Sequence, residues 1–353
     1  MDLRKSVKAK LVLEDKSVFY GKSFGFNSST AGEIVFCTGM VGYPESLTDP
    51  SYSGQILVNT YPLIGNYGVP EHKKSIPSNL ESNKIQVKGL IVQDYSFQYS
   101  HWNAKKSLGK WLQEFKVPAL YGIDTRALTQ KLRSKGTMLG KIVIEKETDF
   151  FNPNEINLVE QVSCAEEKSI GKGNKKIALV DFGAKHGIIR SLNKRNLKVL
   201  IVPWNAKLKN LDVDGFVLSN GPGDPALLKK PIANVKELLK NEKPVFGICL
   251  GNQILGHAAG IKTYKLKFGH RSQNQPCINQ ETNNCIITSQ NHGYALENKM
   301  KNGFEKWFVN ANDKTIEGIK HKRKPFYSVQ FHPEACPGPN DADYLFDEFK
   351  EML

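Results

Sequence analysis

The sequence predicts an α/β protein of two domains. The C-terminal domain is built on a doubly wound, mostly parallel sheet, and a separate N-terminal domain is β-rich and of the α+β class. The chain has 353 residues, which exceeds the roughly 100–200 residues of one typical domain. Short β-rich runs fill its first part, whereas its last part alternates continuous apolar runs with helical patterns. Such alternation is typical of a parallel sheet covered by helices on both faces.

The N-terminal elements are short strands broken by turns and followed by helices. Apolar and β-branched residues gather between Gly, Pro, Asn and Asp at residues 9–13, 17–19, 33–38 and 55–60. Residues 107–115 and 125–134 then carry apolar side chains at helical spacing, and Asp124 can cap the second helix. We therefore place an N-terminal domain at residues 1–150, in which helices pack on the strands.

A polar, irregular stretch at residues 151–174 is the predicted linker, because it ends in Gly and charged residues. The C-terminal domain, residues 175–353, follows it. Its predicted strands lie near residues 177–180, 199–202, 215–218 and 245–248, and its predicted helices near 187–195, 233–239 and 254–258. Continuous apolar strands separated by helices indicate the doubly wound parallel sheet.

The composition argues against several functional classes. The formal net charge of +14 is spread along the chain, with 20 basic and 14 acidic residues up to position 150, and 29 and 21 after it. Nucleic-acid binders more often concentrate Lys and Arg on one face or tail, so we expect no nucleic acid as a partner. A distributed positive field could instead attract an acidic protein. The apolar run at residues 11–13 is too short for a signal peptide or a membrane span, so we expect no membrane association.

Cysteine usage indicates a reducing compartment. The six cysteines are Cys37, Cys164, Cys249, Cys277, Cys285 and Cys336. No two of them have the C-x-x-C spacing of a zinc or redox site. We therefore expect reduced thiols, a cytoplasmic location and no metal site.

The strongest chemical motif is Gly-Ile-Cys-Leu-Gly-Asn-Gln at residues 247–253, which begins within a predicted strand. Cys249 lies between glycines at the spacing of a nucleophile elbow, a sharp strand-to-helix turn that exposes the nucleophile. The N-terminus of the following helix supplies N–H groups and positive potential, which lower a thiol pKa and stabilise an oxyanion. A buried structural cysteine is the more common fate of a lone Cys, but the glycine frame favours a nucleophile.

The best candidate for a catalytic base lies in Phe-His-Pro-Glu at residues 331–334. Side chains two apart in an extended chain point to the same side, and Pro333 restricts His332 to extended conformations. Glu334 could therefore hydrogen-bond the imidazole that faces Cys249, as in a catalytic triad. Taken alone, a histidine at a strand end is usually only a satisfied polar residue.

Two further motifs could bind a substrate. Ser-Asn-Gly-Pro-Gly-Asp-Pro at residues 219–225 follows a predicted strand, and its glycines allow the backbone to approach a ligand. Its N–H groups could complete an oxyanion hole with the N–H of Leu250, although Gly-Pro-Gly is by default a surface turn. Gln-Asn-His-Gly-Tyr at residues 290–294 could hold the amino-acid end of a substrate.

Together, the motifs at residues 247–253, 219–225 and 331–334 resemble the class I, triad-type glutamine amidotransferases. The resemblance extends to the small subunit of carbamoyl-phosphate synthetase and covers nearly the whole chain. It implies a class I glutamine amidotransferase-like fold for the C-terminal domain. The additional motifs are Thr-Gly-Met-Val-Gly-Tyr-Pro-Glu-Ser-Leu-Thr-Asp-Pro-Ser-Tyr at residues 38–52, Tyr-Pro-Leu-Ile-Gly-Asn-Tyr-Gly at 61–68, Gly-Ile-Asp-Thr-Arg-Ala-Leu at 122–128 and Tyr-Lys-Leu-Lys-Phe-Gly-His-Arg at 264–271.

The resemblance implies a role for each matching residue. Cys249 would attack the side-chain carbonyl of L-glutamine, His332 would shuttle the proton and Glu334 would orient the histidine. Ammonia would leave, and water would hydrolyse the remaining glutamyl thioester to glutamate. The implied substrate-binding residues are Ser51, Gly221, Gly223, Leu250, Gln253, Asn291, Gly293 and Tyr294.

The resemblance also implies a partner, the large subunit of carbamoyl-phosphate synthetase, in a hetero-oligomer. That large subunit would convert the ammonia, with bicarbonate and ATP, to carbamoyl phosphate for pyrimidine and arginine synthesis. The chain contains no G-x-x-x-x-G-K-[ST] loop and no dinucleotide fingerprint. We therefore expect no cofactor in this chain, and ATP and Mg²⁺ on the large subunit.

Alternatives stay open at this point. The chain could be the amidotransferase subunit of another synthetase, such as one that makes anthranilate or a purine nucleotide. It could also be a non-catalytic scaffold that retains the fold, since fold does not fix function. Two residues depart from the family pattern, because Asn252 stands where His is common and Cys336 where Ser is usual. These departures leave the detail of the pocket open.

Overall fold

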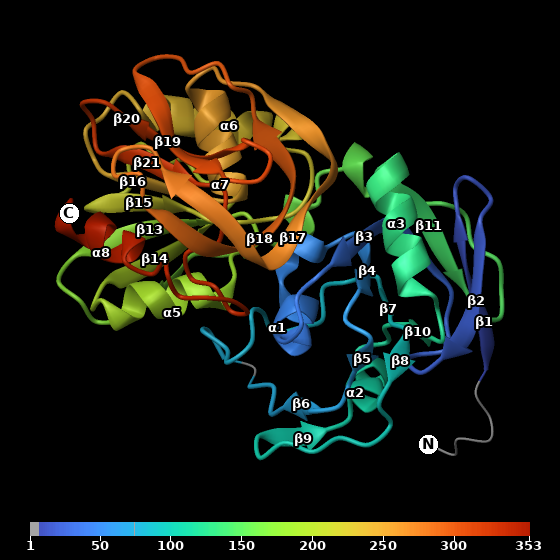
Figure 1. Cartoon of the computed structure of the whole chain (residues 1–353). Coiled ribbons are helices and arrows are strands. Elements are labelled where there is room, and N and C mark those ends of the chain that lie inside the picture. The colour runs from blue at the N-terminus through green and yellow to red at the C-terminus, as the bar shows by residue number, and fades with distance from the viewer. Residues whose placement is uncertain (1–6, 74) are drawn as a thin grey trace. The chain divides into compact units, whose positions relative to one another are not determined.

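The computed structural model describes residues 7–73 and 75–353 and divides the chain into two compact units, Met1–Glu155 and Ile156–Leu353 (Figure 1). The predicted linker, residues 151–174, contains regular structure: η3 (Pro153–Glu155), α4 (Val159–Val162) and β12 (Lys168–Ile170). β12 pairs antiparallel with the sheet of the second unit. Its side chains are mostly exposed, so it lacks the apolar alternation by which a strand is recognised in sequence.

The first unit contains a closed β-barrel. Within its described residues the strand order is β1-β11-β3-β4-β7-β10-β2. The barrel strands are β1 (Lys8–Leu13), β2 (Val18–Ser23), β3 (Thr30–Cys37), β4 (Gln55–Asn59), β7 (Gly89–Ile91), β10 (Ala119–Tyr121) and β11 (Met138–Val143). The remaining elements are α1 (Tyr43–Thr48), η2 (Pro50–Tyr52), β5 (Leu63–Ile64), β6 (Val69–Pro70), β8 (Asp94–Tyr95), β9 (Ala104–Lys106), α2 (Leu108–Glu114) and α3 (Thr125–Lys135). The predicted β-rich α+β class is confirmed, and barrel closure is an addition to it.

Both predicted helices of this unit begin at side-chain caps. Ser107 Oγ accepts a hydrogen bond from the N–H of Lys110 at 3.3 Å, and Asp124 Oδ1 accepts one from Ala127 at 2.8 Å. These bonds satisfy N–H groups that a helix N-terminus leaves without internal partners. The α2 helix then buries Trp111 in the apolar core against the barrel.

The second unit is built on a ten-stranded sheet in the order β12-β14-β13-β15-β16-β21-β20-β18-β17-β19. Strands β14, β13, β15, β16 and β21 are mutually parallel, which confirms the predicted doubly wound core. The strands are β13 (Lys176–Asp181), β14 (Lys198–Pro203), β15 (Gly215–Leu218), β16 (Val245–Ile248), β17 (Thr263–Asn279), β18 (Cys285–Leu296), β19 (Phe304–Asn310), β20 (Ile316–His321) and β21 (Phe326–Val329).

Helices cover both faces of the parallel core (Figure 1). Ala178 and Val180 of β13 face a core shared with α6 and α7, whereas Ile177 and Leu179 face a core shared with α5 and α8. This alternation follows from the two-residue period of a strand, and burial on both faces explains the continuous apolar run. The helices are α5 (His186–Lys194), α6 (Lys229–Leu238), α7 (Leu250–Ala258) and α8 (Leu345–Glu351), with a 3-10 turn η4 (Pro225–Leu227) before α6.

Strands β17 to β20 add an antiparallel extension beside β21. The sequence did not predict this extension, because its long strands carry polar residues on buried as well as exposed positions. No helix within the described ranges is long and apolar enough to cross a membrane.

Candidate active site

The carboxyl ends of the parallel strands converge on one set of loops. β13 lies between β14 and β15, and the helices that follow β13 and β15 pack on opposite faces of the sheet. Where two neighbouring strands are followed by helices on opposite faces, a crevice forms at the carboxyl edge of an α/β sheet, and ligands bind there. Loops after β13, β15, β16 and β21 therefore surround the candidate site.

Cys249 occupies the sharp turn between β16 and α7. Its backbone has φ 55° and ψ −103°, a strained conformation for a residue with a side chain. An added Cβ at Gly251 would lie 2.1 Å from Leu218 O, and one at Gly247 would lie 2.8 Å from Gly251 O. Only glycine fits at these two positions, so the glycine frame seen in the sequence permits the turn. Cys249 is buried, and its thiol donates to Asn291 O at 3.7 Å.

His332 and Glu334 form the predicted pair. Nδ1 of His332 lies 2.7 Å from Glu334 Oε1, and both side chains are buried. Because a carboxylate only accepts, Nδ1 carries the proton and Nε2 is left for another partner. Among the described residues, Nε2 has no hydrogen-bond partner. The thiol of Cys249 is near enough to affect the charge state of the ring.

A buried lysine completes the pair, and sequence reasoning missed it. Nζ of Lys185 lies 3.0 Å from Glu334 Oε1 and donates to Ala335 O. The lysine is held by the loop after β13, where Asp181 accepts backbone N–H bonds that shape the turn. Its own N–H donates to Asn220 Oδ1 at 2.9 Å. Its position just after a buried parallel strand was the one available signal, since that edge of the sheet carries site residues.

The pKa values of His332 and Glu334 are shifted in opposite directions by the charged groups around them. Burial lowers the pKa of His332, but the neighbouring carboxylate of Glu334 outweighs burial and raises that pKa above its usual range. Burial raises the pKa of Glu334, but Lys185 and His332 outweigh it and hold that pKa below its usual range. The carboxylate thus stays ionised beside a histidine that readily holds a proton.

Several predicted binding residues lie around Cys249. Leu250 is the first residue of α7, so its N–H is one of those a helix leaves without an internal partner. Gly221 packs against Phe182 and the Leu250 side chain, and Gly223 has φ +91°. The Ser219 carbonyl accepts the N–H of Gly251 at 3.0 Å, which joins the loop after β15 to the turn.

The remaining predicted binding residues divide between the two units. Gln253 donates from Nε2 to Tyr294 O at 3.0 Å, so α7 is tied to β18. Asn291 and Gly293 belong to the same strand, and the Asn291 carbonyl accepts from Cys249. Ser51 lies in η2 of the first unit, where its N–H donates to Asp49 Oδ1. Its contribution to glutamine binding stays a prediction.

The two departures from the family pattern have separate surroundings. Asn252 is buried, donates to Gln330 Oε1 at 3.1 Å and accepts from the Ser328 hydroxyl at 2.8 Å. It therefore holds the strand beneath the turn. Cys336 lies two residues beyond Glu334, with its sulfur 3.5 Å from an Nη2 donor of Arg190.

The arrangement can perform acyl transfer. A strained cysteine at a helix N-terminus is near enough to affect the charge state of a histidine whose Nδ1 is held by a carboxylate. These are the residue types that an activated nucleophile, its base and an orienting group require.

Comparisons with known proteins assign families to both parts of the chain. Residues 11–142 match the family model "carbamoyl-phosphate synthase small chain, CPSase domain", and residues 178–352 match "glutamine amidotransferase class-I". The mitochondrial carbamoyl-phosphate synthase [ammonia] of Homo sapiens is 51% identical over 99% of this chain and 24% of its own length. The multifunctional protein pyr1-3 of Dictyostelium discoideum is 47% identical over 100% of this chain and 17% of its own.

The chain thus spans about a quarter or less of the length of these curated relatives. Among solved structures, a glutamine amidotransferase of Thermotoga maritima is 18% identical, with a TM-score of 0.39. That match covers 46% of this chain and 77% of the other.

Proposed function

The chain belongs to the carbamoyl-phosphate synthase small-chain family and carries its glutamine amidotransferase domain, and from this premise we propose that Cys249, His332 and Glu334 hydrolyse glutamine. The observation that carries the proposal is the strained, buried Cys249 at the N-terminus of α7, beside a histidine already bonded to a carboxylate. The released ammonia supplies carbamoyl phosphate synthesis.

The reaction proceeds in two steps. His332 accepts the thiol proton, Cys249 Sγ attacks the glutamine side-chain carbonyl, and the proton passes to the departing nitrogen, which leaves as ammonia. The glutamyl thioester that remains is attacked by water, and the C–S bond breaks to give glutamate and the free thiol. Glu334 keeps Nδ1 protonated and stabilises the imidazolium in both steps. Lys185 keeps Glu334 ionised.

Backbone N–H groups would stabilise the oxyanion. The N–H of Leu250 and the loop containing Gly221 and Gly223 meet at the turn that carries Cys249, which is where negative charge develops. Within the second unit, substrate glutamine would also contact Gln253, Asn291, Gly293 and Tyr294.

The residues of this chain itself indicate the nitrogen donor. The names of the mammalian relatives specify ammonia, whereas this chain has a cysteine in the nucleophile position with a complete His–Glu pair. A domain that only served as a scaffold would have no need for a strained cysteine, because strain of about 1–3 kcal/mol persists only where other structure enforces it. Glutamine is therefore the proposed donor.

The proposed partner is a carbamoyl-phosphate synthase part that binds ATP and Mg²⁺. Support comes from the relatives, which are several times longer than this chain. The synthase part is either a separate large subunit or a continuation of the same polypeptide.

Two assays in parallel test the proposal. The chain with its synthase part is assayed for carbamoyl phosphate formation with glutamine or with ammonium chloride as the nitrogen source. We expect Cys249→Ala to abolish synthesis from glutamine and to leave synthesis from ammonium intact. Equal loss with both donors would indicate a misfolded or unassembled protein, which near-UV circular dichroism and gel filtration identify. Undiminished synthesis from glutamine in the folded variant would contradict the mechanism.

A further inference from the structure

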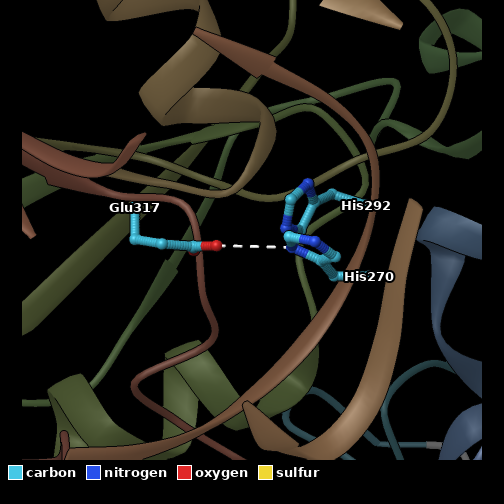
Figure 2. Close-up of side chains that lie close together, drawn as sticks. All are labelled: His270, His292 and Glu317. Atoms are coloured by element: carbon cyan, nitrogen blue, oxygen red, sulfur yellow. Dashed lines mark ion pairs between the residues drawn. The ribbon is translucent and has the colours of Figure 1, made fainter. Parts of the chain in front are cut away.

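A second buried polar cluster lies in the antiparallel extension of the second unit, apart from the proposed triad. His270 of β17 and His292 of β18 are directly opposite each other in the strand register, and Glu317 comes from β20 (Figure 2). All three residues are buried, and one ligand atom from each lies within 4.8 Å of the other two. Three strands therefore place two imidazoles and a carboxylate around one point.

The protons of His270 can be assigned from its neighbours. Nε2 lies 2.8 Å from Asp313 Oδ2, and because a carboxylate only accepts, Nε2 carries the hydrogen. Nδ1 of the same ring lies 3.4 Å from Glu317 Oε1 (Figure 2). In the neutral ring this is a lone pair facing a carboxylate oxygen, which is unfavourable in a buried place unless a cation lies between them.

His292 makes the same kind of unfavourable contact, in which two hydrogen-bond acceptors face each other. Its Nδ1 lies 2.8 Å from the Tyr294 carbonyl and must donate, so Nε2 presents a lone pair. That lone pair faces Gln290 Oε1 at 3.0 Å. A second pair of acceptors is thus in contact, on the side of His292 that faces the cluster.

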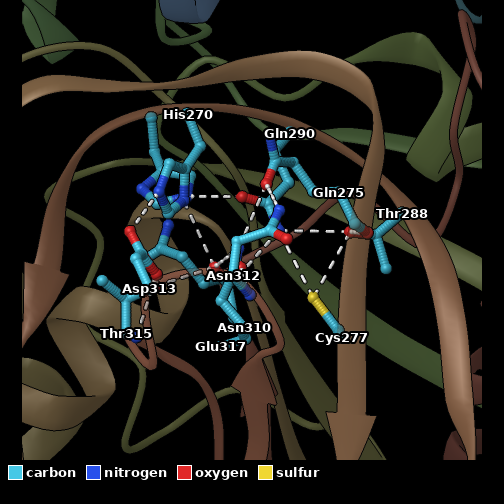
Figure 3. A network of polar contacts seen from close by, with 12 residues as sticks. His270, Gln275, Cys277, Thr288, Gln290, Asn310, Asn312, Asp313, Thr315 and Glu317 are labelled. Atoms are coloured by element: carbon cyan, nitrogen blue, oxygen red, sulfur yellow. Dashed lines mark hydrogen bonds and ion pairs between the residues drawn. The ribbon is translucent and has the colours of Figure 1, made fainter.

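The orientation of the Gln290 amide is fixed by its other neighbours (Figure 3). Nε2 of Gln290 donates to Glu317 Oε2 at 3.0 Å and lies 3.1 Å from Thr288 Oγ1. The Thr288 hydroxyl itself donates to Gln275 O at 2.8 Å. If the Gln290 amide were flipped, its oxygen would face the Glu317 carboxylate and the Thr288 hydroxyl oxygen, whose hydrogen is already donated to Gln275 O. Neither group could then donate a hydrogen bond to the amide oxygen. The orientation with Oε1 towards His292 is therefore preferred.

Protonation of the two histidines relieves these two acceptor–acceptor contacts poorly. One proton on Nδ1 of His270 would satisfy the contact with Glu317, but the contact between His292 and Gln290 would remain. A second proton would place two positively charged rings with centroids 5.0 Å apart in a buried site. A single divalent cation, by contrast, attracts all four lone pairs at once.

We propose that His270 Nδ1, His292 Nε2 and Glu317 bind a divalent metal ion of the zinc class, with Gln290 Oε1 as the fourth ligand. The 3.4 Å between His270 Nδ1 and Glu317 Oε1 matches the edge of a tetrahedron with bonds of about 2.1 Å, which is roughly 3.4 Å. Imidazole and carboxylate ligands suit zinc. The ligand atoms of His270, His292 and Glu317 all lie within 4.8 Å of one another, so small side-chain shifts would bring all three to bonding distance of one ion.

The surrounding contacts are those expected around a metal. A ligating histidine usually donates its other N–H to a carboxylate or a carbonyl, which fixes the ring and its tautomer. His270 donates to Asp313 and His292 to the Tyr294 carbonyl. Glu317 Oε1 accepts from Asn310 Nδ2 at 3.2 Å and lies 3.3 Å from Thr315 Oγ1 (Figure 3).

Such an ion would join β17, β18 and β20 and stabilise the extension. It departs from the expectation of no metal site, which depended on cysteine spacing alone. The ligands come from three strands and from positions 270, 290, 292 and 317, so no short motif connects them. β18 also carries Asn291, and a metal that orders this strand would act on the glutamine site only indirectly.

Metal binding to the full chain, first stripped with a chelator, tests the proposal without an activity assay. Calorimetric titration with Zn²⁺ and the absorption spectrum with Co²⁺ are measured for the wild type, His270→Gln and Glu317→Gln. His321→Gln is the matched control, because His321 lies on β20 with Glu317 but packs against Phe304 and Phe326. Thermal unfolding with and without Zn²⁺ is recorded for each protein.

We expect one equivalent bound by the wild type and His321→Gln, with affinity at least about tenfold lower in the other two variants. The Co²⁺ spectrum should lack thiolate-to-metal charge transfer, and Zn²⁺ should raise the unfolding temperature only where the site is intact. Absence of binding to the stripped wild type would overturn the proposal. So would equal affinity in folded Glu317→Gln. If neither variant folds, the wild-type spectrum decides, because thiolate bands would assign the ion to cysteines.

Discussion

The second unit contains two buried free thiols, Cys249 and Cys277, and their surroundings differ. Cys249 lies in a strained turn at the N-terminus of α7, next to the His332–Glu334 pair. Cys277 lies within β17, where its sulfur is 3.5 Å from Thr288 Oγ1 and accepts from Gln290. Burial raises the pKa of Cys277. Backbone position is therefore the main difference between the proposed nucleophile, Cys249, and the thiol within the strand, Cys277.

The two clusters also differ in charge. Lys185 balances Glu334 at 3.0 Å, so the proposed triad needs no further cation. The ring of His270 lies between two carboxylates, Asp313 and Glu317, and the proposed metal ion would provide the missing positive charge. In the two proposals, the same residue types would serve proton transfer in one place and metal binding in the other.

The largest expected effect distinguishes the two thiols. Cys249→Ala should lower the glutaminase rate by about 10³-fold or more, since removal of a nucleophile removes the covalent pathway. Cys277→Ala should leave the rate within about threefold, because its thiol is shielded within a strand. Glutamate release from glutamine measures both. Comparable losses in the two folded variants would show that backbone position does not separate the thiols.

Next in size is the loss of the buried cation. Lys185→Met should destabilise the protein by about 3–5 kcal/mol, because the buried carboxylate of Glu334 would lose one of its two charged partners and keep only His332. Lys194→Met on the helix that follows removes an exposed pair with Asp343 and should cost less than about 1 kcal/mol. Urea unfolding at neutral pH measures the free energy of unfolding of both variants. Similar losses in the two would show that the buried Lys185–Glu334 pair does not stabilise the fold more than an exposed pair.

The same variant should change the dependence of stability on pH. The pKa of Glu334 is lowered in the folded protein, so its contribution to stability is present above the unfolded pKa and is lost as pH falls through the folded pKa. Lys185→Met raises that folded pKa towards the unfolded one, so the acid-induced loss should be smaller and should be complete at a higher pH than in the wild type. Urea unfolding curves recorded between about pH 3 and pH 7 compare how the stability of the wild type and of Lys185→Met depends on pH.

A smaller effect concerns the histidine. Glu334→Gln removes the charge that raises the pKa of His332, so burial should then dominate and lower that pKa. The imidazolium would be lost at lower pH, and the alkaline limb of kcat/KM should move down by about one pH unit or more. Glu281→Gln, an exposed carboxylate variant outside both clusters, should not move the limb. An unmoved limb in Glu334→Gln would remove the carboxylate from the mechanism.

The smallest expected effect tests Asn252. Ser328→Ala deletes the hydroxyl that donates to Asn252 Oδ1 and should cost about 1 kcal/mol of stability. The KM for glutamine should stay within about twofold, because Asn252 holds the strand beneath the turn. A tenfold rise in KM with unchanged stability would place Asn252 in the substrate pocket.

Much of the fold could be predicted because periodicity is a local signal. The parallel strands of the second unit are buried on both faces and appear as continuous apolar runs. The barrel depends on pairings between distant segments, such as Lys10 with Val143, which no local pattern reveals. Strands β17 and β18 bury polar side chains in hydrogen-bonded networks, so they lack the alternation of a half-buried strand.

The residues of the candidate site also fall into those that a local sequence pattern predicts and those that it does not. Cys249, His332 and Glu334 were predictable because glycine spacing and a two-residue separation have direct geometric meaning. Lys185 was missed because its partner, Glu334, is far along the chain, and a buried lysine looks like a surface lysine in sequence. The cluster of His270, His292 and Glu317 was missed because three separate strands contribute to it.

Direct detection of the acyl-enzyme tests the central claim most closely. The full chain is mixed with glutamine, quenched in acid and analysed by peptide mass spectrometry. We expect a glutamyl adduct on the peptide that contains Cys249, and none on the corresponding peptide of Cys249→Ala or on the peptide that contains Cys277. Continued glutamate production with Cys249 unmodified at every quench time, or undiminished in Cys249→Ala, would contradict covalent catalysis by this residue.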